Sequence, residues 1–169
     1  MTIRALAGNI LNGTISGYAG TRAMTPVTTK LAGMQSKSDQ EQEKKVSPGV
    51  SYNIAAQRLA ARVGIVLDDQ GAAKVGTLFH QGLGLGAGEL YVLLRRKTSL
   101  GPIPAALLTS MALFLGIDEG LTPAMGWSAP ITAYPVSTHV RGFLGHLTLG
   151  LTVMAISEVL FKVRLGGRH

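Results

Sequence analysis

The sequence predicts an all-α membrane protein with four transmembrane helices and one amphipathic helix in the first loop. Its 169 residues are 46% hydrophobic and 15% charged, whereas a soluble domain carries about 25% charged residues. The apolar residues gather in four long runs, and most of the 22 glycines lie inside those runs. Because small residues let helices approach closely, we expect a single, tightly packed membrane domain over residues 1–169.

The last apolar run, residues 139–161, carries the strongest membrane signal. About 20 residues of helix cross a hydrocarbon core of roughly 30 Å, and this run is long enough. It contains the ionisable residues His146 and Glu158, with Arg141 near its start. Ionisable side chains are costly inside a bilayer, so we expect these residues to have partners and treat them as functional candidates.

The first predicted span, residues 5–30, is weaker because polar side chains and Pro26 interrupt it. Gly13 and Gly17 form a GxxxG pair, which favours packing against another helix. Arg22 lies near the far end, where it either reaches lipid phosphates or pairs with an acid of another span. A signal peptide is the alternative interpretation, but no convincing cleavage site follows the apolar residues.

Residues 34–72 form the long polar segment of the chain. It opens with the letters QSKSDQEQEKKVSPG, whose mixed charge predicts a solvated or flexible loop. From Tyr52 to Val66, apolar residues recur at helical spacing, which predicts an amphipathic helix. That helix lies on the membrane interface, caps the bundle or binds a partner; the sequence leaves these alternatives open.

The second predicted span, residues 73–94, ends at a run of three basic residues. Its glycines match the dinucleotide fingerprint GxGxxA, but no strand precedes them, so we expect them to serve helix packing. His80 and Glu89 lie about 180° apart on this helix and should therefore face different neighbours. The glycines predicted to pack in this span and in the last one are Gly82, Gly84, Gly86, Gly88, Gly142 and Gly150.

The third predicted span, residues 100–117, has two prolines in its first turn, where a helix tolerates them. We expect Asp118 and Glu119 to end it. Three further prolines occur in residues 118–138, which predicts an irregular loop or a re-entrant cap.

The basic residues predict the orientation. Four spans place both termini on one side, together with the basic run that ends the second span. Residues 118–138, on the other side, contain no Lys or Arg. The positive-inside rule therefore places the termini in the cytoplasm, although the Lys and Arg residues of segment 34–72 oppose this orientation.

Several function classes lack support in the sequence. The chain has no Cys, which excludes disulfides, thiolate catalysis and Cys-ligated metals. Its formal charge is +7, but no aromatic-interleaved basic patch predicts nucleic-acid binding, so membrane topology and anionic lipid explain the charge better. No arrangement of Ser, His and Asp predicts hydrolysis, and we expect no enzyme activity.

A set of residues at characteristic spacing resembles the YagU-like family of small bacterial inner-membrane proteins. The set comprises Gly17, Gly20, Arg22 and Pro26 of the first span, His80, the turn Gly120-Leu121-Thr122-Pro123, Pro130, and Gly145-His146 with Glu158. The family has no established reaction. The resemblance implies a multi-pass protein of the bacterial inner membrane, loosely associated with acid tolerance.

Two functions remain open from the sequence. The first is an oligomeric conduit or transporter-like protein in which His80, Glu89, His146 and Glu158 line a polar path. The second is a non-catalytic anchor or accessory subunit that docks a larger complex. Either function calls for the lipid bilayer and a second copy or partner membrane subunit. We expect no cofactor, although His80 and His146 could together hold a haem as axial ligands.

Overall fold

The computed structural model describes residues 3–166 and contains no strand within that range. Residues 1–2 and 167–169 of the predicted domain lie outside the description. The all-α prediction is therefore confirmed for the described chain. Its helices are α1 (Ile3–Met34), α2 (Lys37–Val46), α3 (Ser51–Arg62), α4 (Asp69–Lys97), α5 (Pro102–Met111), the π-helix η1 (Ala112–Leu121), α6 (Thr122–Ala124), the short 3-10 helix η2 (Ile131–Ala133) and α7 (Val136–Gly166).

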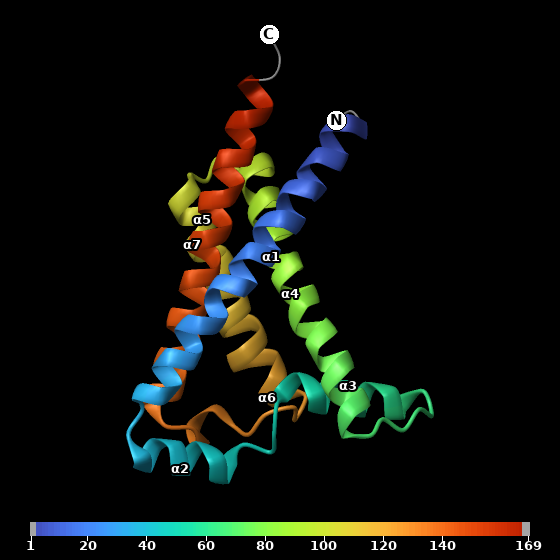
Figure 1. Ribbon diagram of the computed structural model, residues 1–169, viewed down its shortest axis with the longest axis vertical. Coiled ribbons are helices and arrows are strands. Elements are labelled where there is room, and N and C mark those ends of the chain that lie inside the picture. The colour runs from blue at the N-terminus through green and yellow to red at the C-terminus, as the bar shows by residue number, and fades with distance from the viewer. Residues whose placement is uncertain (1–2, 167–169) are drawn as a thin grey trace.

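The long helices form a bundle with two different ends. α1 packs against α4 and α7, α5 packs against α7, and α3 packs against the start of α4. The two ends of the described chain lie together at one end of the bundle, whereas α2 and α3 lie at the other end (Figure 1). The loop between α6 and α7 lies beside α2, so two segments far apart in sequence form one polar end.

Glycine allows α1 and α4 to touch through their backbones. A Cβ on Gly17 would collide with the carbonyl oxygen of Gly84, and one on Gly88 would collide with that of Gly13. On α7, a Cβ at Gly150 would come within 2.7 Å of the Ala106 carbonyl of α5. These positions exclude a side chain, and the bundle depends on them for its close helix contacts.

The other predicted packing glycines behave differently from one another. A Cβ at Gly142 would lie 3.1 Å from the Phe114 ring, so α7 also approaches η1 closely. Side chains at Gly82 and Gly86 would meet no neighbouring atom within 4 Å. Gly82 and Gly86 therefore do not pack against another helix within the described residues. That they pack against a second chain stays a prediction.

The segment after residue 34 is solvated, as predicted, since Lys37–Val46 has no buried residue, but it is helical rather than a loop. The Ser36 side chain accepts a hydrogen bond from the Asp39 backbone at 3.1 Å and caps the helix start. Lys44 and Lys45 occupy the last turn, where positive charge stabilises the helix dipole. Farther along, the amphipathic helix is confirmed but ends at Arg62, before the left-handed Gly64 (φ 78°), rather than at Val66.

The third predicted span is longer than expected. Asp118 and Glu119 do not end it, because the helix continues through the π-helical turn η1 and α6 to Ala124. It stops where Gly126 adopts a left-handed conformation with φ 68°. The irregular segment predicted from residue 118 therefore begins only after Ala124, and the two acids stand on the helix itself.

Two of the described helices are long and apolar enough to cross a membrane. They are the continuous helix Pro102–Ala124, with a mean hydropathy of 1.3, and Val136–Val163, with 1.6. α1 and α4 are as long but contain more polar residues. By length and composition, the structure therefore agrees with a membrane protein through these two helices.

Candidate functional site

A cluster of ionisable side chains joins α3, α4, η1 and α7. Asp118 of η1 accepts a hydrogen bond from the Tyr52 hydroxyl of α3 at 3.2 Å. Its second carboxylate oxygen lies 3.6 Å from Nε2 of His146 on α7. His80 of α4 stacks at a tilt on the Tyr52 ring, with ring centroids 5.2 Å apart. We call these four residues, Tyr52, His80, Asp118 and His146, the Asp118 cluster.

The hydrogen bond of His146 fixes which ring nitrogen carries a proton. Nδ1 is 2.9 Å from the backbone carbonyl of Gly142, and a carbonyl only accepts, so Nδ1 donates. Nε2 then faces the carboxylate of Asp118. At 3.6 Å the two groups are too far apart for a direct hydrogen bond, and they form an ion pair only when Nε2 also carries a proton.

His146 is buried, with 5% of its surface exposed, which matches the close approach of helices at Gly142.

Burial, and the neighbouring Asp118, raise the pKa of Tyr52 well above its usual value, so this hydroxyl stays protonated and donates to the carboxylate. A small cavity of about 10 Å³ is lined by all four members of the Asp118 cluster. That is about the volume one water molecule needs.

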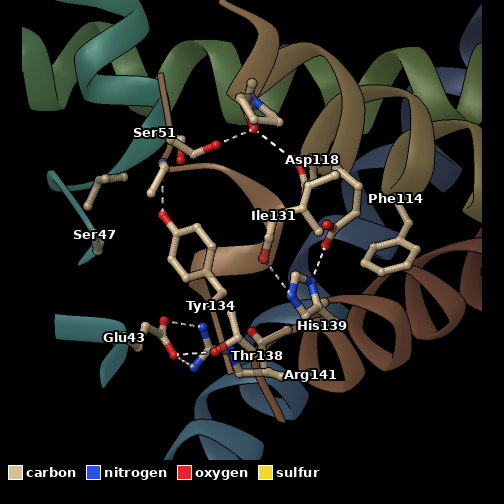
Figure 2. Close-up of a pocket in the computed structure, with 18 of the residues that line it drawn as sticks. Glu43, Ser47, Ser51, Phe114, Asp118, Ile131, Tyr134, Thr138, His139 and Arg141 are labelled. Atoms are coloured by element: carbon tan, nitrogen blue, oxygen red, sulfur yellow. Dashed lines mark hydrogen bonds and ion pairs between the residues drawn. The ribbon is translucent and has the colours of Figure 1, made fainter. Parts of the chain in front are cut away.

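A larger cavity lies between the polar end and the bundle and shares Tyr52 and Asp118 with the small one. Its volume is about 740 Å³. Figure 2 shows Glu43 bound to Arg141 at one side of this cavity and His139 beside Phe114 at another. Two members of the Asp118 cluster, Tyr52 and Asp118, therefore lie at the wall of a space large enough for a small molecule.

An ion pair between Glu43 and Arg141 fastens α2 to α7. The shortest distance is 2.6 Å, and Arg141 also donates to the Gln35 side-chain oxygen at 2.6 Å. Thr138 donates to the same carboxylate at 2.7 Å. Burial raises the pKa of Glu43, but the hydrogen bonds from Arg141 and Thr138 outweigh it, so the pKa lies below its usual value.

This lowered pKa predicts a pH-dependent contribution to stability. A carboxylate with a lowered folded pKa stabilises the protein above its unfolded pKa, and the gain is lost as pH falls through the folded pKa. At pH 7, Glu43→Gln should therefore lower the free energy of unfolding by about 1–2 kcal/mol, and the difference should shrink as pH falls through the lowered folded pKa of Glu43. Thermal unfolding of the purified protein at several pH values measures this.

Glu41 provides the matched control, because it is exposed on the same helix. Glu41→Gln should match wild type at every pH. If Glu43→Gln unfolded at the wild-type temperature at pH 7, the ion pair would not be what fastens α2.

His139 forms a second pair with a carboxylate. Its Nδ1 lies 2.8 Å from Glu119, and its Nε2 lies 3.2 Å from the carbonyl of Ile131. Nε2 donates to the carbonyl, which only accepts, and the contact of Nδ1 with Glu119 needs one proton between the two groups. Tyr134 packs edge-on against this ring, with centroids 6.4 Å apart.

The structure brings together only some of the predicted site residues. His80 and His146 meet at Asp118, whereas Glu158 lies at the opposite end of the bundle, paired with Arg95 at 2.7 Å. Its carboxylate also accepts from the Tyr91 hydroxyl at 2.9 Å. These contacts therefore do not join His146 and Glu158 in one polar path.

Two further candidates also lie away from the cluster. Glu89 faces α1, where it accepts a hydrogen bond from Thr14 at 3.4 Å, as its opposite orientation to His80 predicted. Arg22 is exposed and forms no hydrogen bond or ion pair with the described residues, so it is not part of a buried pair. Arg141 lines the larger cavity at the polar end rather than the interior of the bundle.

The geometry leaves little room for a haem between His80 and His146, because the cavity that both residues line measures about 10 Å³. Nδ1 of His146 is also bound to Gly142 and Nε2 faces Asp118. Among residues 3–166, no three His, Asp or Glu side chains are grouped so that they could hold a metal ion.

Sequence reasoning missed the acids at the centre of the site. Asp118 and Glu119 were expected to end a helix, and Tyr52 to be part of an apolar helix face. No signal in the sequence placed these acids inside a helix, because Gly116 and Gly120 flank them and Pro123 follows. His139 and Arg141 also stand two residues apart at the start of the last apolar run.

We compared the chain with family models, curated proteins and solved structures, and none matches. The resemblance to the YagU-like family consequently rests on residue spacing alone. The site must be interpreted from its own geometry.

Proposed function

We propose that this protein is a four-span protein of the bacterial inner membrane that carries protons, or a solute coupled to them, through the Asp118 cluster. The observation that carries the proposal is the Asp118–His146 pair, whose facing atoms lie 3.6 Å apart and could share one proton, with Asp118 also lining a cavity of about 740 Å³. Ionisable residues inside a membrane are costly and mark transport pathways or proton relays.

The distribution of polar and apolar side chains supports four spans. The outer faces of α1 and α4 carry exposed apolar residues, including Ile10 at 50%, Leu11 at 57% and Leu78 at 64%. The interior, in contrast, is lined by small polar side chains, which membrane helices use for close packing. Those less than 2% exposed are Asn12, Ser16, Thr109, Ser110 and Ser157. In water, such exposed apolar faces would be unfavourable, whereas lipid or another chain would cover them.

The proposed orientation gives the cavity a role. If the chain ends are cytoplasmic, as the basic residues predict, the polar end formed by α2 and α3 faces the periplasm. The Asp118 cluster would then sample external pH through the larger cavity. That arrangement accounts for a link to acid tolerance, because a His side chain changes charge between about pH 5 and pH 8.

The test is a proton flux assay in proteoliposomes. Wild type should conduct protons above the level of empty liposomes, with a rate that changes between about pH 5 and pH 8. His146→Gln keeps a donor and an acceptor but does not titrate, so it should insert normally and lose most of the flux. If His146→Gln matched wild type across this range, the proton-carrying role of His146 would have to be abandoned.

A second candidate, a non-catalytic anchor or subunit, is favoured by one observation. Gly82 and Gly86 lie on an open face of α4 beside exposed Leu78 and Phe79, and a second copy or a partner helix would cover this face. Homo-oligomerisation through it is compatible with both functions. Native mass spectrometry of wild type and Gly86→Leu distinguishes a closed oligomer from a monomer surrounded by lipid.

A further inference from the structure

The larger cavity gathers acidic side chains in a chain that is basic as a whole. The chain has 16 Lys and Arg against nine Asp and Glu. Among the described residues that line the cavity, however, there are three acids, Glu43, Asp118 and Glu119, and one Arg, Arg141. Arg141 neutralises Glu43, and His139, which also lines the cavity, pairs with Glu119 at 2.8 Å. Asp118 and Glu119 therefore make the cavity negative when His139 and His146 are uncharged. A concave site lined by one sign of charge concentrates ions of the opposite sign.

Aromatic rings form much of the remaining wall. Tyr52, Phe114 and Tyr134 all line the cavity. Aromatic faces attract cations, and they also provide apolar surface for carbon groups. The volume of about 740 Å³ is in the range of pockets that hold small molecules and is far larger than a bare ion requires.

We propose that the larger cavity binds a small organic cation, an ammonium group attached to an apolar or aromatic body. Asp118 and Glu119 would supply the negative charge for the ammonium group. The three aromatic rings would contact its carbon body. The inference deepens the proposed function, since it rests on the same site and names the ligand class that would exchange with the proton.

The ligand and the shared proton compete for the same site between Asp118 and His146. The groups that face Asp118 are Tyr52 from α3, His80 from α4, His146 from α7 and the neighbouring Glu119. While His146 holds the proton as an imidazolium, it already neutralises Asp118. When that proton leaves, the carboxylate and Nε2 of His146 are both acceptors, and an ammonium N–H can replace the lost donor. Binding of the ligand should therefore release about one proton to solvent.

The experiment titrates the full-length protein in detergent with benzylammonium. Its neutral and anionic counterparts, benzyl alcohol and benzoate, test the requirement for positive charge. Trp127, the one Trp in the chain, lies beside the cavity-lining Ser128 and provides a fluorescence signal. Calorimetry in buffers of different ionisation enthalpy counts the protons released, and detergent micelles without protein correct for partition of the probe.

We expect saturable binding of benzylammonium at pH 8, at least tenfold weaker binding at pH 5, and at least tenfold weaker binding of benzyl alcohol and benzoate. Asp118→Asn and Glu119→Gln should each weaken benzylammonium at least tenfold. Asp69→Asn, an exposed acid at the start of α4, should bind like wild type. If Asp118→Asn fails to fold, the comparison of the three probes on wild type still tests whether the cavity requires a positive charge.

Three results would overturn the inference, two of them in the binding experiment and one in comparison with the flux assay. The first is equal binding of the neutral and cationic probes, and the second is binding that neither releases protons nor changes with pH. The third, proton flux in liposomes without benzylammonium binding, would leave the proposed function intact and remove this inference. Binding with proton release but no flux would keep the inference and remove transport.

Discussion

The Gly88→Leu variant is expected to lose about 3 kcal/mol of unfolding free energy or more, because Gly88 lies where two helix backbones touch. A Cβ at this position would collide with the carbonyl oxygen of Gly13 and lie 2.7 Å from the backbone nitrogen of Gly17. Backbone atoms cannot rotate out of the way as a side chain can, so α1 and α4 would have to separate. To measure the loss, the detergent-solubilised variants are heated, and the fraction that stays folded is quantified by size-exclusion chromatography.

Gly82→Leu is the matched control on the same helix. No atom lies within 4 Å of a Cβ at Gly82, so the change in stability of the single chain should stay within about 0.5 kcal/mol. If Gly88→Leu were as stable as Gly82→Leu, the close contact of α1 with α4 would be wrong. A loss of assembled mass in Gly82→Leu alone would instead identify its face as an interface between chains.

The Asp118→Asn variant is expected to reduce proton flux in proteoliposomes at least tenfold. Asn has nearly the same shape, can accept the hydrogen bond from Tyr52 and can donate to Nε2 of His146, so the fold should be kept. It cannot hold the shared proton, however, and the pair loses its negative charge. The flux at several pH values, in liposomes with equal amounts of inserted protein, measures the effect.

Glu89→Gln serves as the control for this experiment. Glu89 is also an acid on a long helix, but it faces Thr14 of α1 and does not line either cavity. Flux through Glu89→Gln should equal that of wild type. A similar loss in both variants would place the path between α1 and α4 rather than at Asp118.

The sequence carried the information that is local to each helix. Apolar runs predicted the long helices, and helical geometry correctly placed Glu89 and His80 on opposite faces of α4. Gly142, four residues before His146 on α7, is a predicted packing glycine, and Phe114 of η1 lies against it and near the imidazole. These features depend on residues a few positions apart, for which helical periodicity is sufficient.

The parts that sequence reasoning missed depend on distant contacts. α2 is polar throughout, so periodicity could not identify it; the capping residue Ser36 could have done so. Its position is fixed by Glu43, whose partner Arg141 lies 98 residues away. Asp118 is stable within a helix because Tyr52 and His146 come to it from two other helices, and no pattern in one sequence shows that meeting.

The assignment of Glu158 illustrates the same limit. Its place in an apolar run predicted an intramembrane acid in need of a partner, and the structure supplies Arg95 and Tyr91. Both partners belong to α4, close to where that helix ends at Lys97. The need for a partner was predictable from physical chemistry, whereas its identity depends on how α4 and α7 lie side by side.

A double-mutant cycle of proton flux tests most directly whether Asp118 and His146 carry one shared proton. The four proteins are wild type, Asp118→Asn, His146→Gln and the double variant, measured in one liposome preparation against empty liposomes. Residues that act as a unit are strongly non-additive, so each single variant should lose at least tenfold and the double variant should lose no more than either one. Losses that multiply in the double variant, or wild-type flux in either single variant, would contradict the shared proton.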